Sequence, residues 1–448
     1  MAKDEKSCFY TYEIDLKFYF KNVNNDEITV PSLLLTKGTK RFNFVENFYP
    51  IWEGSCYINI RYLEPMRVNR DKIYAVLRVI KKRRNTGENM GILSTEELFT
   101  DRFIPFFTDD SFPNYARETD LEPVDSKGNK TLTTSNMASA LNHEVKFALF
   151  SENALNFNKV NVNFNAKECD VGTAIKYIIH HSQQTNNIKP KVIIDNPSNK
   201  NKYKFITVPS HIPSMAFKWL QVRYGIYDTG LTAFYDSPNL YILNKYATIH
   251  DKKKDSISKI VLEIFTDPNM AINPSAIYEK DNTVTLKVAQ NPTKMDSDIF
   301  ISELIGNEII YSNYSFISHA LKFKEGEYEK YNIPYSLIRK PTNKHVKSLP
   351  KARVDYDELN NPINTQAFLK GSSLHTIITI GRINTIPLEV VRPNTIVQIK
   401  IKDDENKDLE LSGLYTIVSG DIIFAQDNND KTDYITELHN LVLIKIDE

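Results

Sequence analysis

The chain has 448 residues, of which 41% are hydrophobic and 25% charged, with 56 basic and 56 acidic side chains. This length suits two to four domains that each bury a hydrophobic core. The net charge of zero removes the simplest argument for a nucleic-acid-binding protein, which normally carries a basic excess or a basic face. Tyr and Phe are abundant, at 24 each, and aromatic residues favour pleated, half-buried sheets, so a mainly β protein is expected.

The N-terminal sequence and the cysteines indicate where the chain is made. Charged side chains at Glu13, Asp15 and Lys17 interrupt any apolar core of a signal peptide, and no run reaches the roughly 18 apolar residues of a membrane span. The three cysteines are far apart, which fits neither a disulfide framework nor a zinc site. We therefore expect synthesis in a reducing cytoplasm, without membrane insertion.

Residues 1–164 are predicted to form a first β domain. Between residues 9 and 20 apolar and polar side chains alternate, which is typical of a strand with one buried face. Two further strands are expected within 41–65, and another at 71–84, which ends in the basic run Lys81 to Arg84. We interpret this run as a solvated strand end rather than a phosphate-binding site, because charge runs usually lie in water.

The second half of this domain is predicted to contain one short helix and long loops. Ser94 and Glu97 in the sequence STEELF match a capping box, in which each side chain bonds the backbone amide of the other. The stretch 105–140 is rich in Pro, Asp, Asn, Ser and Thr, which is typical of surface loops. Strands are expected to resume over 143–164 and to complete the domain.

Residues 165–249 are predicted to form a small α+β domain. Its first helix is expected at 171–182, where Asp170 can cap the N-terminus and apolar side chains form one stripe. A second helix is expected at 212–224, ended by the glycine that follows it.

The same domain is predicted to contain a strand at 189–196 and a hairpin at 231–246. The sequence Asp-Ser-Pro-Asn at 236–239 favours the hairpin turn. Met215 and Trp219 lie one helical turn apart on the second helix and therefore share a face. We expect Trp219 to be largely buried against the first helix.

Residues 250–448 are predicted to form a second β domain. A charged DKKKD sequence marks the junction, and apolar, β-branched strands are expected at 257–265, 282–290 and 300–313. The polar stretch 322–366 is interpreted as a long connection. The last strands are expected over 373–448, where two β-branched runs around a polar loop predict a terminal hairpin.

The search for catalytic motifs finds no complete site. His143 and Glu144 begin a zinc-protease motif, but Phe147 stands where the second His is required. His180 and His181 lie about 100° apart on the predicted helix, so they cannot share one ligand. The phosphate-binding loop, the dinucleotide-binding turn and the serine-hydrolase elbow are also missing from the sequence.

Two polar loops have the composition of calcium sites but not their spacing. Residues 403–408 and 427–433 alternate oxygen-bearing side chains, but Lys407 or Lys431 occupies the fifth position, where an EF-hand needs an oxygen. The glycine and the glutamate that such a loop requires later are missing. We interpret both stretches as solvated hairpin loops, and no metal or other cofactor is expected.

Cys169 is the strongest candidate nucleophile. It precedes a predicted helix, whose dipole can lower the pKa of a thiol, and some peptidoglycan-cleaving cysteine peptidases place their nucleophile in this way. The flanking Glu168 and Asp170 act in the opposite direction, because negative neighbours raise the pKa of a thiol. No catalytic partner can be assigned by position. Catalytic residues are therefore not predicted, and a structural protein is favoured over an enzyme.

Two stretches carry a resemblance to a known family. The first, VPSHIPSMAFKWLQVRYGIYDTGLTAFYDSPNLYILNKY, combines an approach strand, a helix with the pattern A-F-x-W-L, a glycine and a hairpin. The second, TIGRINTIPLEVVRPNTIVQIKI, combines a glycine turn with a Pro-Asn turn and leads to the terminal hairpin. Both resemble the tail-hub or baseplate-hub proteins of tailed bacteriophages and related contractile injection systems.

The resemblance implies a fold and an assembly. In that family two tube-like β-barrels in one chain repeat the fold of the tail-tube subunit, and an α+β insertion lies between them. The implied fold is mainly β, with antiparallel barrel domains at 1–164 and 250–448 flanking a small α+β domain at 165–249. We expect the two barrels to superpose and the terminal hairpin to close the second one.

The resemblance also implies partners and a place in the virion. A homotrimer presents six barrels and would join the six-fold tail tube protein to a three-fold central spike protein, with tape-measure and baseplate wedge proteins nearby. DNA would pass through this ring without specific binding. The protein would lie at the tail tip or baseplate of the virion, after assembly in the cytoplasm of the bacterial host.

Two alternatives stay open at this point. The first is a tail-associated, cell-wall-degrading cysteine peptidase that uses Cys169. The second is a carbohydrate-binding tail adhesin, which the aromatic content permits, although alternating aromatic residues in strands more often pack cores.

Overall fold

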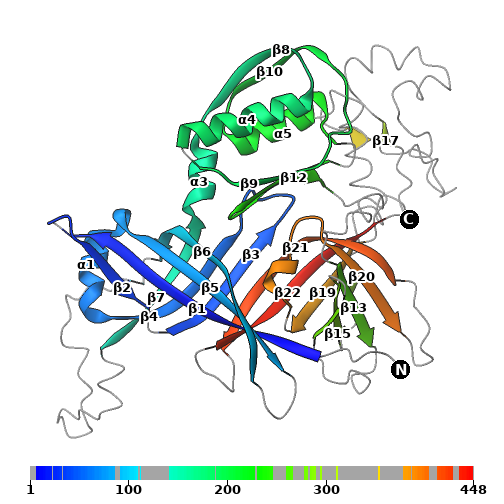
Figure 1. The fold of residues 1–448 in the computed structure, drawn as a ribbon. Helices are drawn as coiled ribbons and strands as arrows, with labels where there is room; N and C mark the ends of the chain where they lie inside the picture. The colour runs from blue at the N-terminus through cyan, green and yellow to red at the C-terminus, as the bar shows by residue number, and fades with distance from the viewer. Residues whose placement is uncertain are drawn as a thin grey trace, which may run out of the picture.

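The computed structural model is mostly strand, with a few short helices (Figure 1). It describes residues 7–446 except 23, 33, 86–90, 109–110, 112–140, 187, 228–229, 246–258, 266–276, 281–282, 289–292, 295–308, 311–351, 354–376, 385, 403–410 and 427–432. The expectation of a mainly β fold with a small α+β unit is confirmed. Most of the loop stretch predicted at 105–140, most of the connection at 322–366 and the polar loop 403–408 lie outside the described residues. Residues 105–107 of the first stretch form the end of a strand instead of a loop.

The N-terminal strands form one antiparallel sheet. Their bounds are β1 Ser7–Lys21, β2 Glu27–Pro31, β3 Leu34–Asn43, β4 Ile51–Asn59, β5 Tyr74–Asn85, β6 Ile92–Phe107 and β7 Asn142–Ser151, with a short helix α1 at Leu63–Val68. The order of pairing is β1, β5, β6, β7, β4, β3. The strand predicted at 9–20 is confirmed, and Tyr12, Phe18 and Phe20 on its apolar face are buried.

The helix predicted from the capping box is wrong. Ser94 and Glu97 lie in the first half of the long strand β6, where they pair with Arg83 and Ile80 of β5. The Glu97 carboxylate accepts a hydrogen bond from Arg78 at 2.7 Å across the two strands instead of capping a helix. The capping residues precede no apolar stripe long enough to pack a helix, so pairing with β5 decides the conformation.

The α+β unit contains three helices among its described residues. Its elements are α3 Glu152–Lys159, β8 Val162–Cys169, α4 Val171–Asn186, β9 Lys191–Ile194, β10 Tyr203–His211, α5 Pro213–Tyr224, β11 Leu231–Asp236 and β12 Asn239–Asn244. The helices predicted at 171–182 and 212–224 and the hairpin turn at 236–239 are confirmed. Gly225 ends α5 with a φ of 70°, a left-handed conformation that favours glycine.

The sequence prediction of strands throughout 143–164 is wrong in its middle part. β7 ends at Ser151, whose hydroxyl accepts a hydrogen bond from the Ala154 amide and so caps α3. Ala154 and Phe157 of α3 are buried in the core of the α+β unit. This serine cap is a local helix signal that the alternation of the flanking strands concealed.

Trp219 is not buried against α4, contrary to the prediction. Its indole is half-buried, and its Nε1 donates a hydrogen bond to the Thr207 carbonyl on β10 at 3.2 Å. The ring packs near His211, with centroids 5.6 Å apart. Phe217 of the same helix is fully buried, as are Ala216 and Leu220. The i, i+4 partner Met215 is 49% exposed, so the face shared by Met215 and Trp219 lies at the edge of the α+β core, against which Trp219 only partly packs.

Because Phe217 rather than Trp219 is fully buried, we expect substitution of Phe217 to destabilise the protein more than substitution of Trp219. Replacing Phe217 by alanine is expected to lower the free energy of unfolding by about 3–5 kcal/mol, because it leaves a cavity in the core. Replacing Trp219 by alanine is expected to cost about half as much, since only part of its surface leaves water on folding. Urea unfolding of both variants measures the order, and a larger loss for Trp219→Ala would contradict this assignment.

The C-terminal strands form the second part of the sheet. The longer ones are β13 Lys259–Phe265, β14 Ile277–Lys280, β15 Thr283–Val288, β19 Ile377–Asn384, β20 Ile396–Lys402, β21 Gly413–Gln426 and β22 Asp433–Lys445. The short ones are β16 Thr293–Lys294, β17 Ile309–Ile310 and β18 Ala352–Arg353, and a 3-10 turn, η9, spans Leu388–Val390. β13 pairs in parallel with β15 and β20, whereas most other neighbours are antiparallel.

The terminal hairpin of β21 and β22 belongs to both parts of the sheet. Residues 413–416 of β21 pair with β20, whereas residues 419–424 pair with β3. β22 pairs with β19 over 437–444 and with β1 at 433–434. The strands β3, β4, β7, β6, β5, β1, β22 and β21 thereby form a closed ring, and Figure 1 shows the red hairpin beside the blue strands.

β21 changes partners at a register irregularity between Ile417 and Asp421. Such bulges bend a strand and increase its twist. Gly420 lies at this bend, and a Cβ there would stand 3.0 Å from the Phe42 ring and 3.3 Å from a Leu438 methyl. The close approach of the Phe42 and Leu438 side chains therefore favours glycine at this position.

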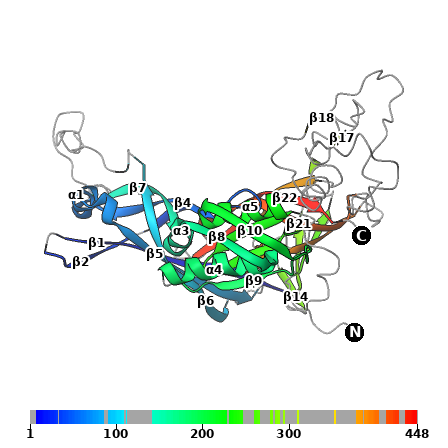
Figure 2. The same ribbon diagram turned by 90° about the horizontal axis from the view of Figure 1, so that it is seen from above.

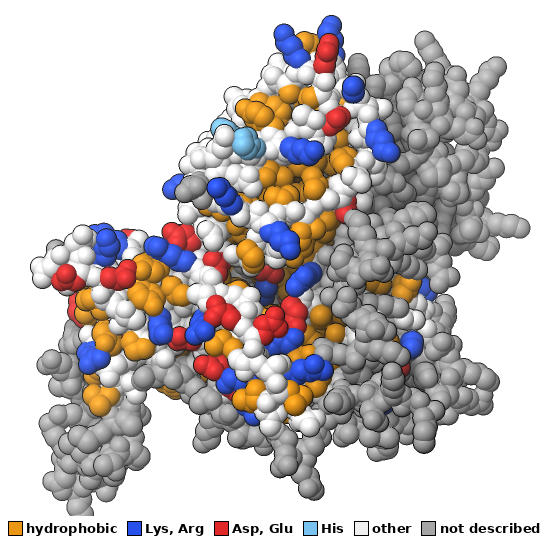
Figure 3. All heavy atoms as spheres, in the orientation of Figure 1, with side chains coloured by type: hydrophobic (Ala, Val, Ile, Leu, Met, Phe, Trp, Pro, Cys, Tyr) orange, Lys and Arg blue, Asp and Glu red, His pale blue; other side chains and the backbone are white. Residues whose placement is uncertain are grey.

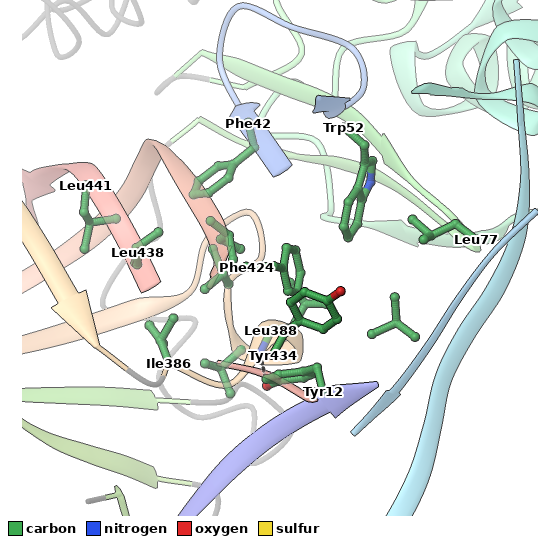
Figure 4. Close-up of a cluster of buried hydrophobic side chains, with 14 of the residues drawn as sticks. Tyr12, Phe42, Trp52, Leu77, Ile386, Leu388, Phe424, Tyr434, Leu438 and Leu441 are labelled. Atoms are coloured by element: carbon green, nitrogen blue, oxygen red, sulfur yellow. Dashed lines mark hydrogen bonds between the residues drawn. The ribbon is translucent and has the colours of Figure 1, made fainter. Parts of the chain in front are cut away.

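One large hydrophobic core runs through both β parts and takes in Phe234 and Tyr241 of the α+β hairpin, and the rest of the α+β unit has its own core. Figure 4 shows side chains from the two parts meeting in the shared core: Trp52 of β4 stacks on Phe424 of β21 at 5.5 Å, and Tyr12 of β1 lies edge-on to the same ring. Seen from above, the α+β unit lies over the middle of the molecule (Figure 2). In the described part of the chain no helix has the length and apolarity to span a bilayer.

Candidate functional site

A buried ionic cluster joins the N-terminal sheet to the terminal hairpin. The Asp433 carboxylate at the start of β22 is 0% exposed and accepts hydrogen bonds from Lys82 Nζ at 2.8 Å, Arg84 Nη2 at 2.7 Å and Thr11 Oγ1 at 2.8 Å. Lys82 also pairs with Glu13 at 2.8 Å. We call Asp433, Lys82, Arg84, Thr11 and Glu13 the seam cluster, because they come from β1, β5 and β22 where these strands meet.

The seam cluster holds its carboxylate in the charged form. Burial on its own would raise the pKa of Asp433, but the hydrogen bonds from Lys82, Arg84 and Thr11 outweigh it and hold the pKa below its ordinary value. Burial would lower the pKa of Lys82, but the hydrogen bonds to Asp433 and Glu13 raise it. Each charge therefore stabilises its partner in a place where neither could be buried alone.

The interpretation of Lys81 to Arg84 as a solvated strand end is wrong. Lys82 and Arg84 are only 14% and 13% exposed and point to Asp433. Lys81, on the opposite side of β5, pairs with Glu389 of η9 and lies over the Tyr10 ring at 3.9 Å. The run therefore links β5 to two C-terminal segments, which supports neither free phosphate binding nor a purely solvated face.

The depressed pKa of Asp433 predicts acid sensitivity of the seam. A carboxyl group whose pKa is lowered on folding stabilises the fold above its unfolded pKa, about 3.9, and loses this contribution as the pH falls through the folded pKa. We expect the difference in unfolding free energy between the wild type and Asp433→Asn to shrink from about pH 7 to about pH 3. Urea titrations at several pH values measure it, and a constant difference would contradict the assignment.

A cavity of about 240 Å³ lies where the N-terminal sheet, the α+β unit and the C-terminal part meet. Its walls come from β3, β4 and β6, from the turn between β11 and β12, and from residues 388–392. Lys40 on one wall is 8% exposed, donates to both oxygens of Asp236 at 3.0 and 2.8 Å, and lies 5.5 Å from the Trp52 ring centroid. This ion pair joins the sheet to the α+β hairpin.

Asp101 is another carboxylate on the cavity wall, and it is buried. It accepts hydrogen bonds from Ser151 Oγ at 3.0 Å, Asn153 Nδ2 at 3.1 Å and the Arg102 amide at 2.9 Å. Burial raises its pKa, and hydrogen bonds, including one with Ser237, act in the opposite direction. Burial, with a contribution from the Asp101 charge, raises the pKa of Tyr235 well above its ordinary value.

Cys169 does not have the surroundings of a nucleophile. Burial, and then the neighbouring Asp170 carboxylate, raise the pKa of its thiol, which disfavours the reactive thiolate. Its Sγ donates weakly to the Ala166 carbonyl at 3.9 Å. The Asp170 side chain instead caps α4 by accepting from the Thr173 amide at 2.7 Å, which confirms the predicted cap.

The remaining sequence candidates are scattered. His143 and Glu144 lie on β7, and His181 of α4 stacks on Tyr177 with centroids 6.2 Å apart. Residues 427–432 of the second polar loop lie outside the described residues, and its last member, Asp433, is paired with cations in the seam cluster. Over the described ranges, no three His, Cys, Asp or Glu side chains are placed to hold a metal ion.

The sequence marks the residues of these sites only in part. Lys82 and Arg84 stand in the basic run, Asp433 in a polar loop and Asp236 in a hairpin turn, whereas nothing in the sequence assigns a role to Asp101 or Glu389. Lys40 carries no local signal either, because β3 also contains Lys37 and Arg41. Figure 3 shows basic and acidic side chains mixed over the lower part of one face, whereas Lys and Arg predominate over the α+β unit at the top.

Solved structures with low sequence identity are similar to the chain. The tail protein from Neisseria meningitidis MC58 is 11% identical, with 96% of each chain covered and a TM-score of 0.45. The 43 kDa tail protein of prophage MuSo2 from Shewanella oneidensis is 9% identical, with 96% of each chain covered and a TM-score of 0.44. An E. coli component of the type VI secretion system is 8% identical over 94% of this chain and 75% of its own, with a TM-score of 0.41.

The comparison with protein families gives the assignment. No curated protein sequence matches the chain. The model of the family described as Bacteriophage PBS1 gene 109 protein matches residues 8–443, which span β1 to β22 and include the seam cluster. The resemblance to a bacteriophage family is thereby confirmed, and the chain belongs to the Bacteriophage PBS1 gene 109 protein family.

Proposed function

We propose that this protein is a structural component of a bacteriophage tail, in the position of a tail or baseplate hub. The observation that carries the proposal is the shared terminal hairpin, together with the bacteriophage family match. The hairpin and the buried seam cluster tie two β parts into one body. A part that transmits force along a tail requires such a rigid connection.

The finer proposal is a closed ring of three chains. We divide the chain into a first barrel at 1–164, an α+β domain at 165–249 and a second barrel at 250–448, with the terminal hairpin crossing into the first. Three copies would present six barrels to a six-fold tail tube and three equivalent faces to a central spike. A closed ring is needed, because an open head-to-tail contact would produce filaments.

The proposed ring would surround a DNA channel at the tail tip. Contacts to phosphates add salt-sensitive affinity, so a passive channel should lack a dense basic lining. The equal numbers of acidic and basic residues and the pairing of Lys81, Lys82 and Arg84 with carboxylates support this view. Tape-measure and baseplate wedge proteins would be the neighbouring partners, and assembly would take place in the host cytoplasm.

Mass photometry and electron microscopy of the purified protein, alone and with its tail tube and spike proteins, test the proposal. The expected particle is a ring of three 51.7 kDa chains, about 155 kDa, with three-fold symmetry. Monomers that persist with both partners would overturn the ring. Release of peptidoglycan fragments that is lost in Cys169→Ala would overturn the structural role in favour of a peptidase, and saturable binding of cell-wall glycans would favour an adhesin.

A further inference from the structure

The strands β8 and β10 form a sheet of only two strands, with the helices α4 and α5 against one of its faces (Figure 1). Ile206 and Val208 of β10 point to the helices and are buried, whereas Phe205 and Thr207 on the opposite face are exposed. A sheet edge whose backbone groups lack partners can pair with a strand of another chain. The two edges of this sheet differ in how they are covered.

The edge of β10 is closed at Thr207 by two side chains of α5. The Thr207 amide donates a hydrogen bond to the Tyr224 hydroxyl at 2.9 Å. The Thr207 carbonyl accepts a hydrogen bond from Trp219 Nε1 at 3.2 Å. Both backbone groups of Thr207 therefore point away from β8 and are occupied, so a further strand cannot bond them.

The edge of β8 is open at Asn165 and Lys167. Asn165 lies opposite Thr207, and opposite residues of an antiparallel pair either exchange two hydrogen bonds or none. Because Thr207 directs its backbone groups away from β8, Asn165 directs its own away from β10, and Lys167 two residues later does the same. Among the described residues no other strand pairs with this edge, and no loop or side chain bonds the amide or carbonyl of either residue. The regular edge ends at Glu168, whose φ of 49° is left-handed.

The side chains beside the open edge indicate which strand it would accept. Lys167 is exposed on the outer face of the sheet, opposite Phe205, and forms no ion pair within the described ranges. On the helix side, Phe164 packs on Tyr177 of α4 with ring centroids 4.4 Å apart, and Tyr177 is 47% exposed. Side chains of a strand alternate between the two faces of a sheet. An added strand would therefore place acidic residues near Lys167 and apolar residues near Tyr177.

We propose that the open edge of β8 binds an extended, acidic segment of another protein, which adds a third strand to the sheet. The main-chain groups of Asn165 and Lys167 give affinity, and the side chains on the two faces select the sequence. A second copy of the chain fits less well, because it would bring two basic edges together and Lys and Arg predominate over the α+β unit (Figure 3). The added strand needs one copy of the chain only, so its binding is independent of the ring proposed above.

Peptides of about seven residues, a common strand length, test the proposal by isothermal titration calorimetry with the full chain. The first peptide alternates glutamate and valine and has blocked ends, and its control alternates lysine and valine. Two further versions of the first peptide carry backbone N-methyl groups, one on all glutamates and the other on all valines. Because alternate amides of a strand face the same edge, only one of these two sets can bond β8.

We expect the glutamate–valine peptide to bind with a Kd on the order of 10⁻⁴ M, since ordering a free peptide offsets much of the gain from pairing. The lysine–valine peptide should not bind, because it meets Lys167 with a like charge. Methylation of one set of amides should abolish binding, and methylation of the other set should leave it nearly unchanged. Equal effects of the two methylation patterns would overturn the proposal.

Variants of β8 test the edge from the side of the protein. Asn165→Pro should abolish binding, because proline removes the amide that faces the edge and leaves the bonds to β10 intact. Asn165→Ala keeps this amide and should bind as the wild type does. Lys167→Gln should weaken binding about two- to fivefold, as expected for a cross-strand charge pair. Lys191→Gln, which removes an exposed charge from β9 of the same unit, is its matched control and should have little effect.

Other occupants of this surface give different results. No saturable binding up to about 2 mM peptide, or binding that Asn165→Pro leaves unchanged, would overturn the proposal. So would tighter binding of an oligothymidine of about 15 nucleotides that Lys167→Gln and Lys191→Gln weaken equally, which would identify a nucleic-acid surface. Self-association that Asn165→Pro abolishes, measured by sedimentation, would assign the edge to a second copy instead. Circular dichroism checks the folding of Asn165→Pro, and the two methylated peptides decide the outcome if this variant does not fold.

Discussion

Replacing Asp433 by alanine is expected to lower the free energy of unfolding by about 3–5 kcal/mol, the range found when one partner of a buried ion pair is removed. The change leaves Lys82 and Arg84 in a site where they are only 14% and 13% exposed, with most of their compensating charge removed. Glu13 cannot replace it, because its own side chain is 45% exposed and its ion pair is with Lys82 rather than Arg84.

Asp421→Ala is the control for this variant. Asp421 lies on β21 of the same hairpin and pairs with Arg41 of β3 at 3.2 Å, but Arg41 is 53% exposed. Exposed ion pairs contribute about 0–1 kcal/mol, so this variant should unfold nearly as the wild type does. Urea unfolding of both variants gives the comparison. Equal losses for Asp421→Ala and Asp433→Ala would mean that the seam cluster contributes no more than a surface pair.

A fragment of residues 1–250 is expected to lack a stable N-terminal barrel. It contains β1 to β7 but not β21 and β22, which close the ring of strands. It also loses Phe424, Tyr434 and Leu438 from the shared core. Each such loss costs about 2–5 kcal/mol, and together they exceed the about 5–15 kcal/mol by which most domains are stable.

Hydrogen exchange measures this result directly. In the fragment the amides of β1 and β3 should exchange far faster than in the full chain, whereas those of α4 and α5 should keep more protection because their core is separate. Joining residues 411–448 to the fragment through a flexible linker should restore part of the protection in β3. Unchanged protection of β1 and β3 in the bare fragment would contradict the shared-ring architecture.

Local sequence patterns predicted individual elements well. The alternation over residues 9–20 gave both a strand and its buried face, because a strand with one face in water repeats every two residues. Gly225 in the sequence predicts the end of α5, because glycine readily adopts the left-handed conformation that ends the helix there. The prediction failed where pairing overrode a local signal, as at Ser94 and Glu97, where a capping box lies in a strand.

The site could not be predicted because its partners lie far apart in the chain. Lys82 and Asp433 are separated by 351 positions, and no local pattern indicates which carboxylate meets which lysine. In the sequence, a basic run at the end of a strand looks the same whether its side chains lie in water or pair with buried carboxylates. The residues that line the cavity could not be predicted for the same reason, since β3, the β11–β12 turn and η9 meet only in the tertiary fold.

The shared hairpin also has a consequence for the time course of synthesis. Between the end of β3 at Asn43 and the start of β21 at Gly413 the ribosome adds several hundred residues. At about 5–20 residues per second this takes tens of seconds. During this interval the growing chain exposes the edge of β3 that β21 later covers, and an open edge can pair with other chains. Until residues 413–445 emerge, the nascent chain is therefore open to pairing with other chains, and we expect its folding yield to depend on translation speed.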